Sequence, residues 1–328
     1  MNATPQQARF RRRLLAAAAA LPLAGPWAAR AQDKVVRLIL PHATGSGVDV
    51  ITRGAQNALA KALGAAVVVD NQAGAGGIVG LQALARAPAD GSTLSVVSNN
   101  GVIFPSVLKS IPFSMPDDFT PIAVCGYTPV VLVVNPAKVA ASTARDFIAL
   151  LKARPGALNF GSGGNGTILH LAAEMLLDEA GAQARHIPYK GVGPMVSDLI
   201  GGQIEFATVA LPSVQAHIKS GALRAIGMAT AQRVAAAPDI PTLAEQGLPG
   251  YAVEAWFAVI GPKGLPPAEV KRVYAALVAA FSAPEVKDLM ARQGNVIQIG
   301  PSEQAMPFFK SELARYAALV KKAGVEAQ

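Results

Sequence analysis

The chain has 328 residues, of which 52% are hydrophobic and 15% charged, so it is long enough for two domains with a sizeable packed core. Its formal net charge is +8, but five of its basic residues lie before residue 32, where there is no acid. The remaining 24 basic and 21 acidic residues give a net charge of only +3. This excess is weak, and residues 32–328 contain no basic run, so the sequence does not indicate a nucleic-acid-binding protein.

The first 31 residues have the three parts of an export signal. A basic region, Arg9 to Arg13, precedes the apolar run Leu14 to Leu23, and Ala29-Arg30-Ala31 supplies the small-x-small pattern for cleavage. The apolar run is shorter than the roughly 20 residues of a membrane-spanning helix. We therefore predict a signal peptide over 1–31 and a periplasmic mature protein. The Arg11-Arg12 pair leaves general secretion and twin-arginine export both open.

Apolar, β-branched runs then alternate with segments of helical period, which predicts the α/β class with helices covering parallel sheets. Strands are predicted at 35–40, 67–69, 94–97, 130–134, 159–160, 186–188, 204–209, 223–228, 253–260 and 296–299. Helices are predicted at 48–63, 143–153, 167–180, 194–200, 266–281, 284–293 and 302–322. Extended crossings between two domains are expected at 119–130 and 251–262, because no flexible linker divides the chain.

Four predicted strand-to-helix turns are rich in small residues, at 43–47, 73–77, 161–166 and 191–193. In an open α/β sheet such turns lie at the carboxyl ends of strands, where helix N-termini and backbone N–H groups favour an anion. Ser46 and Asp49 match a capping box that would fix the first turn. Lys190, in Tyr189-Lys190-Gly191 beside the last turn, is the one cation in this set of loops, so we predict recognition of an anion mainly by backbone N–H groups.

Other site chemistries find less support in the sequence. The pattern Gly161-x-Gly163-x-x-Gly166 lacks the acid that a dinucleotide site needs, and Phe160 replaces the first glycine of a nucleophile elbow around Ser162. Cys125 is the only cysteine and the four histidines are far apart in sequence, so we predict no disulfide, metal or cofactor. An exported serine hydrolase using Ser162 and His170 remains an alternative, although a packing or capping role for His170 is favoured.

A set of motifs in fixed order gives the chain a family resemblance. They are Pro41–Asp49, Asp70–Gly77, Pro88–Gly91, Phe119–Ile122, Leu158–Gly163 with Thr167 and His170, Pro188–Gly191, Asp198–Gly202 and Leu243–Gly250. With these motifs, residues 32–328 resemble the Bug-type substrate-binding receptors of tripartite tricarboxylate transporters. The resemblance implies a two-lobed periplasmic binding protein of type II with a ligand cleft between its lobes. Lobe 1 would be 32–128 plus 254–328, and lobe 2 would be 129–253.

The resemblance also implies a binding function, in which a small carboxylate is captured in the cleft and delivered to the membrane subunits of the transporter. The expected ligand-binding residues are Ala43, Thr44, Gly45, Ser46, Gly74, Ala75, Gly76, Gly77, Ser98, Asn99, Ser162, Gly163, Thr167, His170, Tyr189, Lys190, Gly191, Val209 and Ala210. Val209 and Ala210 stand where similar proteins often carry Asp-Asn, which favours a plain or aromatic carboxylate over an amino acid. We expect a monomer without catalytic activity. A role as the sensing component of a signalling system is the main alternative.

The signal-peptide assignment predicts that the mature protein begins near Gln32. Cleavage after Ala31 removes the basic region and the apolar run together. Intact-mass measurement of the periplasmic fraction should return the mass of residues 32–328. Recovery of a cytoplasmic protein that retains Arg11 to Arg13 would contradict the assignment.

Overall fold

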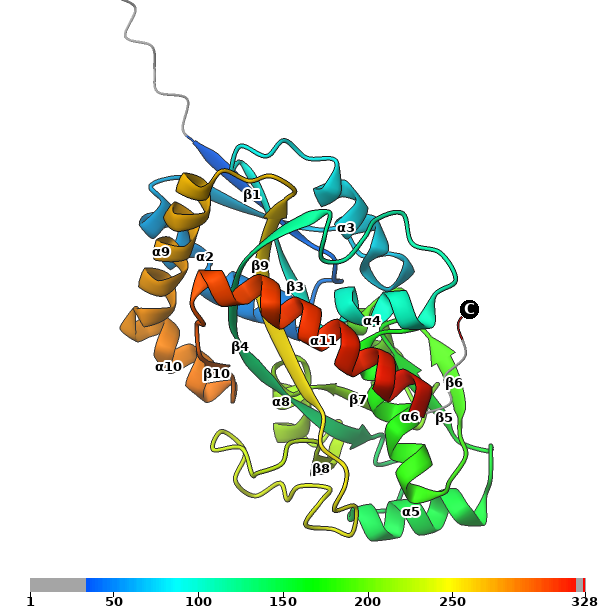
Figure 1. The fold of residues 1–328 in the computed structure, drawn as a ribbon. Helices are drawn as coiled ribbons and strands as arrows, with labels where there is room; N and C mark the ends of the chain where they lie inside the picture. Colours follow the sequence, from blue (N-terminus) through cyan, green and yellow to red (C-terminus); the bar gives the residue numbers. More distant parts are fainter. Residues whose placement is uncertain (1–33, 323–326, 328) are drawn as a thin grey trace, which may run out of the picture. The chain divides into compact units, whose positions relative to one another are not determined.

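The computed structural model describes residues 34–322 and residue 327, so the predicted signal peptide lies outside the described residues. Strands and helices alternate along the chain, as predicted for an α/β protein (Figure 1). The strands are β1 (Val35–Leu40), β2 (Ala66–Asn71), β3 (Thr93–Ser98), β4 (Phe119–Val134), β5 (Asn159–Ser162), β6 (Arg185–Pro188), β7 (Phe206–Ala210), β8 (Arg224–Met228), β9 (Glu254–Pro262) and β10 (Val296–Ile297).

The helices lie between and after these strands. They are α2 (Gly47–Leu63), η1 (Ala75–Gly77), α3 (Ile78–Ala85), α4 (Asn100–Val107), α5 (Ala144–Ala153), α6 (Ile168–Ala180), α7 (Val192–Ile200), α8 (Leu211–Lys219), α9 (Pro267–Ser282), α10 (Pro284–Arg292) and α11 (Ser302–Lys322). Three of these helices, α3, α4 and α8, were not predicted from the sequence. No helix in the described part of the chain is both long and apolar enough to cross a membrane.

The sheet is mixed rather than parallel throughout. Its order is β2-β1-β3-β9-β4-β7-β5-β6, and β8 and β10 also pair with β4. The two outer groups are parallel as predicted, β1 with β2 and β3, and β5 with β6 and β7. The centre is antiparallel, because β9 runs opposite to both β3 and β4, and β4 runs opposite to β7. The two segments predicted as extended crossings thus form the middle of the sheet (Figure 1).

Strand β4 changes partners partway along its length. Residues 119–129 pair with β9, whereas residues 130–134 pair with β7 and β8. The sequence predicted a crossing followed by a separate strand, but the structure makes one strand of 16 residues. The register shifts after Pro121 and again before Gly126. Such irregularities let a strand accommodate a proline, which cannot donate to the ladder.

The first helix begins and ends as its sequence predicts. Ser46 Oγ accepts a hydrogen bond from the Asp49 N–H at 3.2 Å, and Gly64 ends α2 in the left-handed conformation with φ of 61°. The Asp49 carboxylate reaches back to the Gly45 N–H at 3.0 Å, and also accepts from Arg53 and Asn71. This network fixes the turn before α2 relative to the end of β2.

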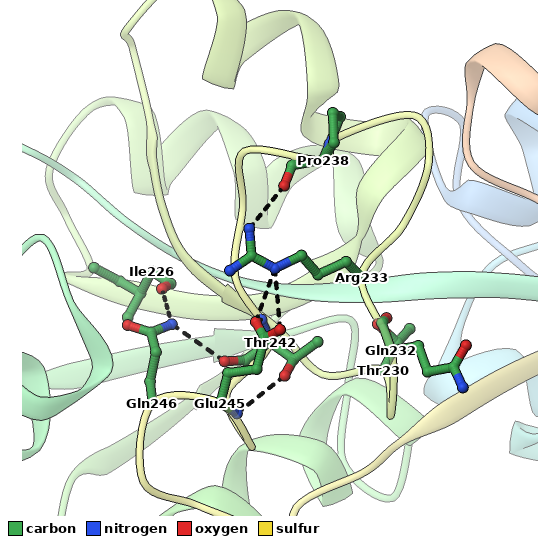
Figure 2. Close-up of polar contacts among 8 residues, drawn as sticks. All are labelled: Ile226, Thr230, Gln232, Arg233, Pro238, Thr242, Glu245 and Gln246. Atoms are coloured by element: carbon green, nitrogen blue, oxygen red, sulfur yellow. Dashed lines mark hydrogen bonds and ion pairs between the residues drawn. The ribbon is translucent and has the colours of Figure 1, made fainter.

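The long connection between β8 and β9 is held by side chains rather than by regular structure (Figure 2). Thr242 and Glu245 cap each other reciprocally, with N–H to oxygen distances of 2.8 and 3.1 Å. Arg233 Nε lies 3.0 Å from both Glu245 oxygens, and this ion pair together with the Thr242 N–H lowers the pKa of Glu245. Gln246 ties the same segment to β8 and α5 through Ile226 O and the Ala144 N–H.

Asn99 connects the end of β3 to β9 and α11. Its side chain is fully buried, donates to Glu254 O and to the Tyr316 hydroxyl, and accepts from the Trp256 N–H at 2.9 Å. Trp256 is held a second time, because its indole N–H donates to the buried Glu312 carboxylate at 2.7 Å. Asn99 was predicted as a ligand-binding residue, and in the structure its side chain serves these internal bonds.

We predict that Asn99→Ala lowers the free energy of unfolding by about 2–4 kcal/mol, because it leaves buried partners unpaired. Urea denaturation at neutral pH measures the loss. Asn57→Ala is the control, since Asn57 is exposed on α2 and should change stability by less than about 0.5 kcal/mol. Equal stability of the two variants would contradict the role given to Asn99.

Candidate functional site

A cavity of about 70 Å³ lies where several helices begin. The first part of its wall comes from residues before and around α2, α3 and α4: Pro41, His42, Ala43, Ser46, Gly47, Val48, Ala73, Gly74, Gly76, Gly77, Ser98 and Asn100. The rest comes from the crossing strands and from the starts of α6, α7 and α8: Thr128, Gly163, Thr167, Ile168, Leu169, Gly191, Val192, Ala210, Ala255 and Trp256. Each of the four predicted glycine-rich turns contributes at least one glycine to this wall, and the 43–47 turn also contributes Ala43 and Ser46.

The N-caps of five α-helices line this one cavity. They are Ser46 of α2, Gly77 of α3, Thr167 of α6, Gly191 of α7 and Ala210 of α8. Each helix N-terminus carries partial positive charge from N–H groups that have no acceptor within the helix. Their convergence makes the cavity a favourable place for an anion.

Capping side chains satisfy only part of these N-terminal donors. Ser46 Oγ takes the Asp49 N–H, and Thr167 Oγ1 takes the His170 N–H at 3.3 Å. The N–H groups of the first helical residues, Gly47 and Val48 of α2 and Val192 of α7, belong to residues that line the cavity. They cannot be bonded within their own helices and are the natural donors to a bound oxygen anion.

The wall of the cavity carries no formal charge, since none of the described residues that line it is Lys, Arg, Asp or Glu. Lys190, the one cation predicted near the site, is next to the lining residue Gly191 in sequence but is not part of the wall. An anion in this cavity would therefore be held by peptide dipoles and hydroxyl groups rather than by an ion pair.

Two lining residues have buried polar atoms without a hydrogen-bond partner in the described part of the chain. They are Nε2 of His42 and Oγ1 of Thr128. Burial lowers the pKa of His42 to about 4 against the opposing effect of Asp49, so its imidazole is neutral at physiological pH. A neutral imidazole and a hydroxyl add both donor and acceptor capacity beside the cavity without adding charge.

The turn after β5 is fixed by two stacked histidines. Ser162 Oγ lies 2.7 Å from His186 Nε2, and His170 Nδ1 accepts from the Gly166 N–H at 3.2 Å. The two imidazole rings stack with their centroids 3.9 Å apart. Ser162 and His170 therefore do not form the pair that a hydrolase would need. Ser162 is fully buried and is not part of the cavity wall, so the serine has a structural role in this turn.

The structure brings about half of the predicted ligand-binding residues together at the cavity. Those in its wall are Ala43, Ser46, Gly74, Gly76, Gly77, Ser98, Gly163, Thr167, Gly191 and Ala210. The others, outside the wall, are Thr44, Gly45, Ala75, Asn99, Ser162, His170, Tyr189, Lys190 and Val209. Tyr189 is turned toward α7, where its hydroxyl donates to the Asp198 carboxylate at 2.8 Å.

Sequence reasoning did not select Asn100, Thr128, Ala255 or Trp256, which also line the cavity. Thr128 and Ala255 are register partners on β4 and β9, so the two crossing strands form part of the wall. The signal available in the sequence was that both segments were predicted to cross between domains. Asn100 could have been found as the first helical residue after β3, by the same reasoning that selected the other strand-to-helix turns.

The sheet has two parallel outer groups joined by β4 and β9, and a cavity lies between helix N-termini, which is the arrangement of a binding protein. Comparison with known proteins gives the family. The family model of the tripartite tricarboxylate transporter family receptor, TctC, matches residues 51–325. Protein BugT of Bordetella pertussis is 36% identical over 293 residues, which cover 89% of this chain and 90% of that protein. The chain therefore belongs to the TctC family of solute receptors.

Solved structures agree with this assignment. The periplasmic binding protein BugD superposes with a TM-score of 0.86 at 28% identity, covering 90% of this chain and 99% of that one. A Rhodopseudomonas palustris protein with adipate gives 0.86 at 27% identity, covering 89% and 98% of the two chains. MatC from the same organism, with bound malate, gives 0.80 at 26% identity, covering 87% and 98%. The predicted fold class, a periplasmic binding protein, is confirmed.

The buried histidine stack predicts a pH-dependent stability. Burial, and then the neighbouring His170, lower the pKa of His186 from 6.5 to about 3. Between these two values the unfolded chain binds a proton at His186 that the folded chain does not, so stability falls as pH decreases from about 6.5 toward 3.

We expect His186→Gln to reduce the loss of stability between pH 7 and pH 4 by roughly 1–2 kcal/mol, after allowing for the exposed part of the ring. Urea denaturation at the two pH values measures the loss. His217→Gln on α8, outside the stack, is the matched control and should retain the wild-type pH dependence. If His186→Gln has the same pH dependence as wild type, protonation of His186 does not contribute to the loss of stability at low pH.

Proposed function

We propose that this chain is a periplasmic receptor that binds a small carboxylate in the cavity and presents it to the membrane subunits of a tripartite transporter. The observation that carries this proposal is the convergence of five helix N-caps on a cavity without charged side chains. Peptide dipoles in a site of low polarity favour an anion, while a cationic or zwitterionic ligand would lack a carboxylate partner. The adipate and malate of two structural relatives are anions of this class.

The receptor role also draws on the path of the chain. Strand β4 pairs with β9 up to residue 129 and with β7 and β8 from residue 130. This change of partners supports a division into lobe 1, 32–128 plus 254–328, and lobe 2, 129–253. The cavity wall draws residues from both lobes, so relative movement of the lobes about β4 and β9 would open and close it.

The proposal includes a periplasmic, monomeric protein without catalytic activity. Relatives described as periplasmic and the predicted export signal support the location. The absence of hydrolysis is supported by two features: Ser162 is buried outside the cavity wall, and no described lining residue is a carboxylate that could act as a general base.

Binding can be followed through Trp256, which lines the cavity and is the only tryptophan after residue 31. We predict that succinate, malate, adipate, benzoate or nicotinate changes its fluorescence in a saturable way, and that calorimetry returns the same Kd. The amide of a binding acid keeps its shape but loses its charge, and should bind at least tenfold more weakly, a difference of about 1.4 kcal/mol. Binding should also weaken as pH falls through the pKa of the ligand's own carboxyl group.

Lys190→Ala tests whether the negative charge of the ligand is stabilised by this side chain or by backbone N–H groups. Because Lys190 lies outside the wall, its removal should change Kd by less than about fivefold. Equal binding of acid and amide, or complete loss of binding in Lys190→Ala, would contradict recognition by backbone N–H groups. Failure of every carboxylate in the panel would contradict the proposed ligand class.

A further inference from the structure

Loops on opposite sides of the cavity approach each other at positions that have no Cβ atom. A Cβ built on Gly47 would lie 2.7 Å from the Cβ of Ala210, and one built on Gly193 would lie 2.8 Å from Thr44 O. A Cβ on Gly191 would overlap the Cβ of Ala43, and one on Gly164 would lie 3.3 Å from the Cα of Gly76. We call this set of close contacts, between residues 43–47 and 76 on one side and 164, 191–193 and 210 on the other, the seam.

A positive φ does not explain two of these glycines. Gly164 and Gly191 have positive φ values of 133° and 117°, which favour glycine in any case. Gly47 and Gly193 are not among the positive-φ residues and lie in the first turns of α2 and α7. Alanine forms helices better than glycine at ordinary helical φ, so at Gly47 the missing Cβ itself is the feature that the structure uses. Gly193 precedes Pro194, which already restricts a preceding residue that has a Cβ, and the close approach of Thr44 O is a second reason for glycine there.

A hydrogen-bonded bridge crosses the cavity beside the seam. Asn100 Oδ1 accepts from the Ile168 N–H at the start of α6 at 2.9 Å, and its Nδ2 donates to Gly76 O at 3.3 Å. Asn100 is buried, so the bond to Ile168 is shielded from water. Asn100 can make both bonds only when the two sides of the cavity are within contact distance. The seam glycines allow the two sides to come this close.

We infer that Gly47 and Gly193 are positioning residues for ligand capture, because only glycine at these positions lets the two sides of the cavity close on each other. Gly193 and its neighbour Thr44 lie outside the cavity wall, so their effect on binding is exerted through closure and not through contact with the ligand. The inference rests on the proposed function, to which it adds the residues that set the extent of closure.

The first experiment adds a methyl group on one side of the seam and removes the facing methyl group on the other. Gly47→Ala places a Cβ against Ala210, and Ala210→Gly removes the Cβ that it meets. We expect Gly47→Ala to weaken binding of the best carboxylate in the panel by roughly tenfold or more, as for an extra methyl in a close-packed contact. The double variant Gly47→Ala/Ala210→Gly should recover most of this loss. Such recovery distinguishes closure from a loss of backbone donors at Gly47, which Ala210→Gly could not restore.

The second experiment tests the seam away from the cavity. Gly193→Ala should raise the radius of gyration of the carboxylate-saturated protein relative to wild type and speed ligand dissociation. Gly300→Ala is the control, because a Cβ there meets nothing within 4 Å and the residue lies outside the cavity wall. Because Pro194 disfavours the helical conformation of an alanine at 193, the thermal midpoint of each variant is measured alongside.

The inference is overturned if Gly47→Ala binds as tightly as wild type, or if the double variant binds no better than Gly47→Ala. A wild-type protein that binds no carboxylate contradicts the proposed function instead. In that case small-angle scattering of the ligand-free proteins tests whether the seam glycines set the extent of closure. A larger radius of gyration in Gly47→Ala that returns to the wild-type value in the double variant supports it, and identical radii in all three proteins overturn it.

Discussion

The proposed function imposes one electrostatic constraint on the structure, which is that an anion in the cavity has to be stabilised without a cationic side chain in the wall. Helix N-termini meet this constraint because their N–H groups are fixed by the backbone and need no ionised side chain. Ser46, Thr167 and Gly191 mark three of the helices whose starts meet at the cavity. The absence of Lys and Arg from its described lining residues avoids the large desolvation cost of a buried ion pair.

Such a site requires turns that hold their shape, because peptide dipoles act only when they point at the ligand. Side chains outside the cavity wall perform this task. Asp49 joins the Gly45 N–H, Arg53 and Asn71 before α2, while Ser162 and His170 hold the turn between β5 and α6. Asn99 anchors β9 and α11 behind the cavity. These residues were predicted to touch the ligand or to cap a helix, and the structure gives them internal partners.

The fold class and the type of site were predictable from the sequence, since both follow from local patterns. Continuous apolar, β-branched runs and period-3.6 hydrophobicity predicted most strands and helices within a few residues, and the glycine-rich turns indicated where helix N-termini would be exposed. Short or strongly apolar helices such as α4, with Pro105 inside it, lack that periodicity and were not predicted. The continuous β4 was also missed, because 119–130 was predicted as a crossing and 130–134 as a separate strand, whereas pairing with β9 and then β7 makes them one strand.

The sequence by itself determined an anion-binding α/β protein of this receptor family, because turn chemistry and motif order are properties of neighbouring residues. Only the tertiary structure decided which turns meet and which residues line the cavity. Thr128 and Ala255 became neighbours through the register of β4 and β9, and Asn100 met Ile168 across 68 positions of sequence. Gly47 and Gly193 look in sequence like ordinary turn residues. Their close approach to Ala210 and Thr44 arises from packing between distant segments, which no local pattern encodes.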